Sequence, residues 1–118
     1  MKSNFFNKPV ENIYLKPFSN AEVVSQILYG EKFKILSKKK NWLKIKTDYD
    51  NYIGYIKVNN FFKSFKPSNK IFKPKSRIFK MKGKQFIQTQ KFLFFGSGIS
   101  VIRKNKKFLE FEKNKWIK

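Results

Sequence analysis

The stretch that decides the fold is Asn41-Trp42-Leu43-Lys44-Ile45-Lys46-Thr47-Asp48-Tyr49-Asp50-Asn51-Tyr52-Ile53-Gly54-Tyr55-Ile56. Its apolar residues Leu43 and Ile45 alternate with lysines, which is the period-two pattern of a half-buried strand. Residues 52–56 are aromatic and β-branched around a glycine, and the polar residues 48–51 between the two runs are typical of a turn. Short strands joined by close turns predict an all-β fold built on a small barrel.

This pattern extends upstream and then recurs. Residues 66–73 interrupt it with Pro67, polar residues and lysines, and we interpret them as a linker. A strand, a charged turn, a strand and a Trp then follow again, so the second half resembles a weaker copy of the first. The sequence predicts two small barrels in tandem, over residues 8–65 and 74–118. Because the closing strand of the second barrel would begin only near Trp116, we expect that barrel to be truncated and loosely held.

The chain contains neither Cys nor His. This composition excludes thiol nucleophiles, disulfides, imidazole bases and the common zinc sites. The seven acidic residues show no paired spacing typical of acid–base catalysis. We therefore expect no catalytic residue, no metal and no cofactor, and no enzymatic activity from this chain on its own.

The chain also carries no stretch with the length and apolarity of a targeting or membrane segment. Residues 1–9 hold no apolar run of signal-peptide length, and no later segment approaches the roughly 18 apolar residues of a membrane helix. We expect a cytoplasmic protein without membrane insertion.

The formal net charge is +21, from 28 basic and 7 acidic residues. Such a balance is compatible with a nucleic-acid-binding small β-barrel, particularly when aromatic residues make up 19% of the chain. However, only Arg77 and Arg103 are arginines, and Arg is the residue that recognises guanine and phosphate in a forked geometry. Nucleic-acid binding is therefore the alternative hypothesis, with nonspecific attraction to polyanions expected in either case.

Three motifs occur in a fixed order in the first half: Val24-Ser25-Gln26-Ile27-Leu28-Tyr29-Gly30-Glu31, Asn41-Trp42-Leu43-Lys44-Ile45 and Asp50-Asn51-Tyr52-Ile53-Gly54-Tyr55-Ile56. Together they resemble the bacterial SH3 domain that precedes the catalytic domain of NlpC-type cell-wall peptidases, in particular the dipeptidyl-peptidase group (γ-D-glutamyl-L-diamino acid endopeptidases). Asn51 stands where that family usually has Gly, and Asn tolerates the same positive φ. Residues 94–101 and 107–111 resemble the second SH3-like domain of the same peptidases less specifically.

The resemblance implies a function and a set of site residues. It implies a non-catalytic SH3 module that binds or positions murein peptide for an NlpC-type catalytic domain encoded separately. By motif position, Glu31 and Tyr52 would hold the free amino end of the substrate at one open edge of the first barrel. Trp42 and Tyr55 complete the predicted substrate-binding set.

Each of these residues also has a purely structural interpretation. Gly30-Glu31 is compatible with a simple turn, and Trp42 and Tyr52 with packing of the barrel. Gly54 is expected at a bend or at a close approach of two backbones.

Overall fold

The computed structural model describes residues 3–118, and every regular element among them is a β-strand. Met1 and Lys2, which belong to the N-terminal stretch considered above, lie outside the described residues. The chain divides into two compact units, of which the first ends at Phe65 and the second is Lys66–Lys118. Two main antiparallel sheets account for most of the strands, so the prediction of an all-β fold is confirmed.

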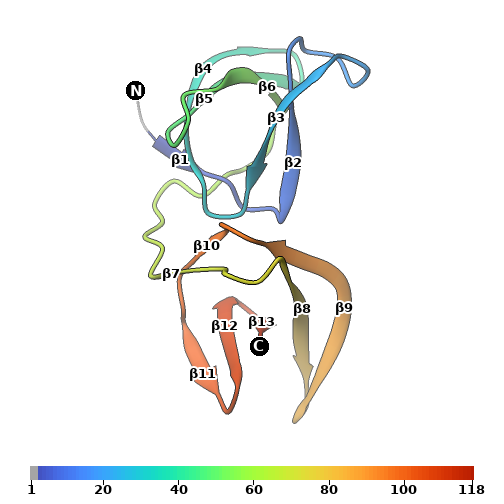
Figure 1. The fold of residues 1–118 in the computed structure, drawn as a ribbon, viewed down its shortest axis with the longest axis vertical. Helices are drawn as coiled ribbons and strands as arrows, with labels where there is room; N and C mark the ends of the chain where they lie inside the picture. Colours follow the sequence, from blue (N-terminus) through green and yellow to red (C-terminus); the bar gives the residue numbers. More distant parts are fainter. Residues whose placement is uncertain (1–2) are drawn as a thin grey trace. The chain divides into compact units, whose positions relative to one another are not determined.

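The first unit is a six-stranded sheet of order β1-β4-β5-β6-β2-β3, which curls into a ring in Figure 1 (blue to green). Its strands are β1 (Ser3–Phe5), β2 (Val10–Tyr14), β3 (Val23–Leu28), β4 (Lys32–Lys39), β5 (Trp42–Thr47) and β6 (Ile53–Lys57). The first half of the deciding stretch forms β5 and its second half forms β6. The two strands pair antiparallel from Trp42↔Lys57 to Lys46↔Ile53, with the predicted turn between them.

The alternation of apolar residues and lysines places one side of each strand in a common core. The buried residues of this core are Phe6, Ile13, Ile27, Phe33, Leu43, Ile45, Ile56 and Phe61. The rings of Phe33 and Phe61 meet edge to face with their centroids 5.0 Å apart. Full burial of such a side chain contributes roughly 1.5–3 kcal/mol, so large rings let a small barrel compensate for its limited size.

The first unit begins before the predicted boundary at residue 8. Strand β1 pairs with β4, and Phe5 exchanges two backbone hydrogen bonds with Phe62, of 2.9 and 3.2 Å. The phenyl rings of Phe62 and Phe65 stack at 5.4 Å, and the ring of Tyr29 meets both edge to face. These contacts tie the two ends of the unit together. The sequence did not reveal them because β1 is too short to show alternation.

The second unit contains a five-stranded sheet of order β11-β12-β13-β8-β9 and a two-stranded pair of β7 with β10 (Figure 1, yellow to red). Its strands are β7 (Asn69–Lys70), β8 (Lys75–Lys82), β9 (Gln85–Phe94), β10 (Gly98–Ile99), β11 (Arg103–Asn105), β12 (Phe108–Glu112) and β13 (Lys115–Ile117). This five-strand order is that of β4-β5-β6-β2-β3 in the first unit. The internal copy predicted from the sequence is therefore confirmed at the level of topology.

Two expectations about the second unit need correction. Residues 66–73 are not a linker, because Asn69 and Lys70 pair with β10 as β1 pairs with β4, and Ile71 is buried. The closing strand is also present, since β13 pairs with β12 on one side and with β8 on the other. The strands at the edges of this sheet are β11 and β9.

The copy extends to one particular turn. In the first unit the Glu31 N–H donates to the Leu28 carbonyl, and Gly30 has a φ of 83°. In the second unit the Ser97 N–H donates to the Phe94 carbonyl, and Gly96 has a φ of 92°. Such φ values favour glycine, because a Cβ is disfavoured in this region.

The turn is held to the start of each unit in the same way. The Gly30 N–H donates to the Phe6 carbonyl and the Phe6 N–H to the Glu31 carbonyl, at 2.8 and 2.9 Å. The Gly96 N–H donates to the Ile71 carbonyl and the Ile71 N–H to the Ser97 carbonyl, both at 2.9 Å. The sequence signal shared by the two N-terminal segments is Lys-Pro, at residues 8–9 and 73–74.

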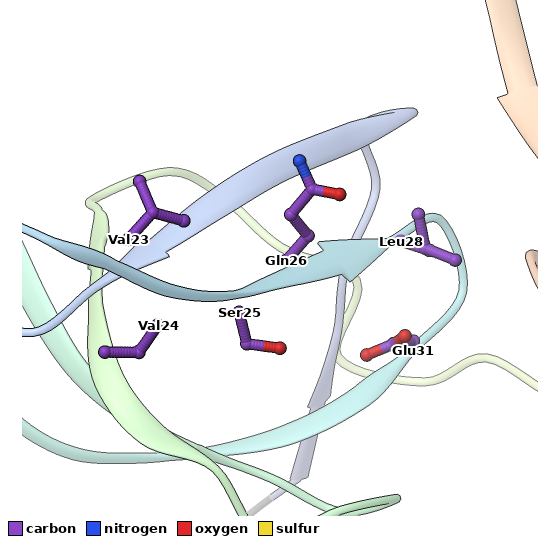
Figure 2. Close-up of a pocket in the computed structure, with 6 residues that line it drawn as sticks. All are labelled: Val23, Val24, Ser25, Gln26, Leu28 and Glu31. Carbon is purple, nitrogen blue, oxygen red and sulfur yellow. The ribbon is translucent and has the colours of Figure 1, made fainter.

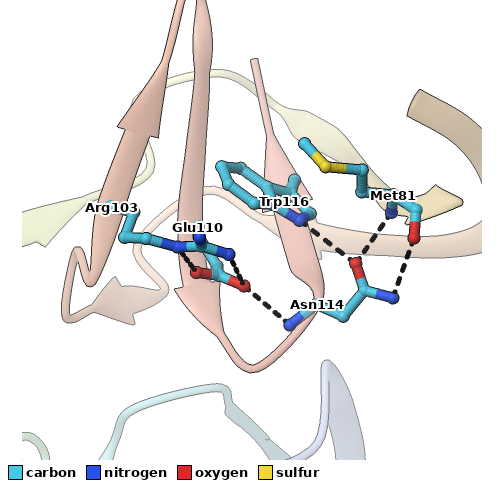
Figure 3. Close-up of polar contacts among 5 residues, drawn as sticks. All are labelled: Met81, Arg103, Glu110, Asn114 and Trp116. Atoms are coloured by element: carbon cyan, nitrogen blue, oxygen red, sulfur yellow. Dashed lines mark hydrogen bonds and ion pairs between the residues drawn. The ribbon is translucent and has the colours of Figure 1, made fainter. Parts of the chain in front are cut away.

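A buried carboxylate stabilises the second unit. The Glu110 side chain, only 5% exposed, accepts a hydrogen bond of 2.8 Å from Arg103 Nε and another of 2.8 Å from the Asn114 N–H. The Asn114 side chain in turn accepts from the Met81 N–H and from Trp116 Nε1 (Figure 3). One carboxylate thereby links β11, the β12–β13 turn and β8. The hydrogen bond from Arg103 lowers the pKa of Glu110, which burial opposes.

Gly54 has the structural role expected of it. A Cβ at this position would lie 2.5 Å from Ile13 Cγ2 and 2.8 Å from the Tyr14 carbonyl oxygen. The second of these neighbours is backbone, which a side-chain rotation does not relieve. Strand β6 can therefore pass close to β2 only with glycine at this point.

We predict that Gly54→Ala lowers the free energy of unfolding of the first unit by roughly 1–3 kcal/mol, because the added methyl group overpacks the contact between β6 and β2. Urea unfolding followed by far-UV circular dichroism measures this change. Asn51→Gly is the matched control in the same hairpin. Its φ of 57° suits either residue, so we expect little change. A Gly54→Ala variant as stable as its control would contradict the close approach.

We also predict that Glu110→Gln destabilises the second unit at neutral pH more than Glu112→Gln does. Glu112 pairs with Lys115 at a more exposed position, where an ion pair contributes little. Because the pKa of Glu110 is lowered, its contribution is present above the ordinary pKa of 4.5 and is lost as the pH falls. Unfolding by urea at several pH values should therefore show the difference between the two variants shrinking in acid. Equal effects of the two substitutions at neutral pH would argue against the buried carboxylate as a stabilising group.

Candidate functional site

A groove runs beside β3, at the edge of the first sheet, and ends at Glu31. It has a volume of about 500 Å³ and is lined by Val23, Val24, Ser25, Gln26, Leu28 and Glu31. Val24 and Ser25 lie on the same side of the strand as the Glu31 carboxylate, whereas Val23 and Gln26 point to the other side (Figure 2). Val24 and Ser25 of the first predicted motif therefore share one side of β3 with the Glu31 carboxylate.

The backbone of Glu31 is fixed at both of its polar groups. Its N–H donates to the Leu28 carbonyl at 3.0 Å, and its own carbonyl accepts from the Phe6 N–H. The side chain is half-buried at the start of β4. The backbone that carries this side chain is therefore already ordered before a ligand binds.

The electrostatic surroundings of Glu31 disfavour its charge. Burial and the neighbouring negative charge of Asp50 raise the pKa of Glu31 to about 7, against an ordinary value of 4.5. A hydrogen bond from the Leu28 backbone to the carboxylate lowers this pKa, but only partly offsets the rise. Stability linked to this group is present below pH 4.5 and is lost as the pH rises through about 7. A cation bound beside Glu31 would relieve this cost, because an opposite charge favours the ionised carboxylate.

Tyr52 belongs to the turn that brings Asp50 to Glu31. The buried Thr47 hydroxyl donates to the Asp50 carboxylate and accepts from the Tyr52 N–H, and the Asp48 N–H donates to the Lys32 carbonyl beside Glu31. Asn51 has a φ of 57°, as its place in the motif predicts. The Tyr52 side chain is 45% exposed. That its hydroxyl and the Glu31 carboxylate face one ligand stays a prediction.

Trp42 and Tyr55 lie elsewhere. Trp42 pairs with Lys39, at the opposite end of β4 from Glu31, and its ring meets that of Tyr14 edge to face at 5.7 Å. Tyr55 pairs with Lys44 on one side and with Tyr14 on the other. The structure thus brings Glu31 together with the turn that carries Tyr52, whereas Trp42 and Tyr55 share a different surface.

Sequence reasoning missed two contributors to the groove end, Asp50 and Ser25. Both lie inside the quoted motifs, but their proximity to Glu31 depends on the pairing of β4 with β5 and on the irregular register between β2 and β3. A sequence signal does exist, because five acidic residues fall in residues 1–66 and three of them are Glu31, Asp48 and Asp50. Only Glu31 of these three lines the groove, while Asp50 lies close enough to raise the pKa of Glu31.

Neither a metal-binding cluster nor a membrane-spanning helix occurs among the described residues. Within residues 3–118, no group of three His, Cys, Asp or Glu side chains lies close enough to hold a metal ion. The same residues include no helix with the length and apolarity needed to cross a membrane.

Comparison with known families places the first unit in a class of small SH3 barrels. The family model of the bacterial dipeptidyl-peptidase SH3 domain matches residues 13–61, a range that includes Glu31, Trp42, Tyr52 and Tyr55. The chain therefore contains a bacterial dipeptidyl-peptidase SH3 domain in its N-terminal part. No curated protein and no solved structure matches the chain.

Proposed function

We propose that the first unit binds the free amino end of a murein peptide and positions it for an NlpC-type peptidase domain encoded separately. The Glu31 carboxylate and the Tyr52 hydroxyl would contact the amino group, and the negative charge of the Asp50 carboxylate would attract it. An ammonium group prefers such partners, because it donates hydrogen bonds to oxygen acceptors and neutralises the carboxylates. The family match to residues 13–61 supports the cell-wall peptidase context.

The observation that carries this proposal is the comparison of the same turn in the two units. Gly30-Glu31 and Gly96-Ser97 form turns with matching φ values and matching hydrogen bonds to the start of each unit. Ser97 is completely buried, and its hydroxyl accepts from the Phe94 N–H. The turn itself therefore requires the glycine but no carboxylate. Glu31 lies half-buried at a groove, with a raised pKa, so a ligand explains it better than folding does.

We predict that Glu31→Gln weakens binding of the peptide L-Ala-γ-D-Glu-diaminopimelate by roughly 10-fold to 100-fold, the range for losing a hydrogen bond between charged groups. Chemical-shift changes in a nuclear magnetic resonance titration of the whole chain measure this affinity. We expect Tyr52→Phe to weaken binding less, because only the hydroxyl is removed. Glu112→Gln, a partly exposed change in the second unit and therefore outside the groove, is the matched control.

The N-acetylated form of the same peptide tests the proposal without any variant. Acetylation removes the positive charge of the amino group and leaves the rest of the ligand unchanged. If the acetylated peptide causes chemical-shift changes as large as those of the unmodified peptide, the amino end is not recognised here. The same conclusion follows if the unmodified peptide causes no changes in residues 23–31.

The raised pKa of Glu31 predicts how binding depends on pH. The carboxylate becomes ionised as the pH rises through about 7, while a peptide amino group loses its proton above about 7.7–8.0. Affinity should therefore rise from pH 6, reach a maximum near pH 7.5 and fall above pH 8, all approximate values that follow from these two pKa values. In the Glu31→Gln variant the affinity should no longer rise between pH 6 and about pH 7.5. An affinity that does not change between pH 6 and pH 7.5 in the unmodified protein would contradict the role of Glu31.

A further inference from the structure

One face of the first sheet gathers lysines and aromatic rings on its solvent side. The pairing of β4, β5 and β6 aligns three rows of side chains, namely Lys39-Trp42-Lys57, Ser37-Lys44-Tyr55 and Lys34-Lys46-Ile53. All nine are exposed or half-exposed, whereas the residues between them along β5 and β6 are buried. Tyr14 of β2 continues the Tyr55 row. We call these ten residues the outer face.

The charge of the outer face is of one sign. Every ionisable side chain in its three rows, Tyr55 aside, is a lysine, and Lys44 and Lys46 follow each other on one side of β5 at about 7 Å. The acidic residues Glu31, Asp48 and Asp50 lie beyond the Lys34-Lys46-Ile53 row, at the Lys32 end of β4, and none of them belongs to the three rows. Glu11 is the acidic group close enough to Lys57 for the lysine to lower its pKa, which burial raises. The face therefore attracts anions more strongly than the groove end does.

The aromatic rings of this face are available for stacking. Trp42 is half-exposed and is held edge to face by Tyr14, with the Lys57 ammonium 6.0 Å from the Trp42 ring centroid. Tyr55 is half-exposed in the neighbouring row. Flat rings between lysines are what a single-stranded nucleic acid needs, because its bases stack while its phosphates are neutralised.

The second unit provides an internal comparison. Its row Arg103-Glu110-Trp116-Phe79 corresponds in topology to the row Ser37-Lys44-Tyr55-Tyr14. There the glutamate is paired with arginine, and Trp116 is only 2% exposed. The same sheet position is thus used for packing in one unit and left open and basic in the other.

We propose that the outer face of the first unit binds single-stranded nucleic acid without sequence specificity, by base stacking on Trp42 and Tyr55 and phosphate contacts from the lysines. This inference is independent of the amino-end site at Glu31. A polymer of phosphates without bases can contact the lysines of the outer face but cannot stack on its aromatic rings.

The test is a fluorescence-anisotropy titration of the full chain with a labelled 12-nucleotide oligothymidylate at several salt concentrations. We expect the double change Lys46→Gln and Lys57→Gln to reduce the slope of log affinity against log salt by about 1.4, the value for two lost phosphate contacts on a single strand. Lys8→Gln with Lys16→Gln removes the same charge outside the outer face and should change the slope clearly less. Equal effects of the two pairs would overturn the proposal.

The contribution of the rings is tested separately. Trp42→Leu should weaken oligothymidylate binding roughly 5-fold to 100-fold and leave the affinity for inorganic polyphosphate unchanged. A second test uses the unmodified protein and a 12-mer that has the same sugar-phosphate backbone but no bases. It should bind more weakly than oligothymidylate by a similar factor. If the 12-mer without bases binds as well as oligothymidylate, or polyphosphate competes equally and Trp42→Leu has no effect, the chain binds polyanions through its overall charge alone and the proposal is wrong.

Discussion

The rest of the structure depends on a four-residue turn that occurs once in each unit, at Leu28–Glu31 and at 94–97. Its glycine adopts a φ that residues with a Cβ disfavour, and the turn then exchanges two backbone hydrogen bonds with the N-terminal segment, at Phe6 in one unit and Ile71 in the other. These bonds hold the beginning of each unit against its middle, across a part of the sheet where β3 forms an edge. The groove lies beside this edge strand and includes Leu28 and Glu31, the first and last residues of the turn.

Because the turn occurs in both units, a comparison of its two copies distinguishes the features that the fold requires from those that a function requires. Both copies keep the glycine and the hydrogen bonds, but one places a half-buried carboxylate at the groove and the other a buried hydroxyl. A carboxylate in a chain of net charge +21 would ordinarily be favoured in its ionised form. Glu31 instead has a pKa of about 7, because burial and Asp50 outweigh the hydrogen bond from the Leu28 backbone. Local desolvation, rather than net charge, therefore sets the chemistry of this site.

Much of the first unit was predictable because its strands are long enough to show alternation and its turn residues are specific. Asn51 at positive φ and Gly54 at a close backbone approach both follow from residue type and position. The beginning of the second unit was not predictable from alternation, since β7 consists of the two polar residues Asn69 and Lys70. The site was only partly predictable. Its first motif marks Glu31, but the approach of Asp50 and the separation of Trp42 depend on strand register, which no local pattern encodes.

The two arginines limit what kind of nucleic-acid recognition is physically possible. Arg77 donates to the Thr89 carbonyl and lies over the Phe92 ring at 4.5 Å, while Arg103 is paired with Glu110 and lies over Trp116 at 5.3 Å. Both guanidinium groups are thus engaged within the second unit. Lysine lacks the forked donor geometry that distinguishes guanine, so the outer face would provide charge and stacking surfaces without a means of distinguishing bases. The affinity of such a surface would depend on whether the nucleic acid is single-stranded and on the salt concentration, and not on the base sequence.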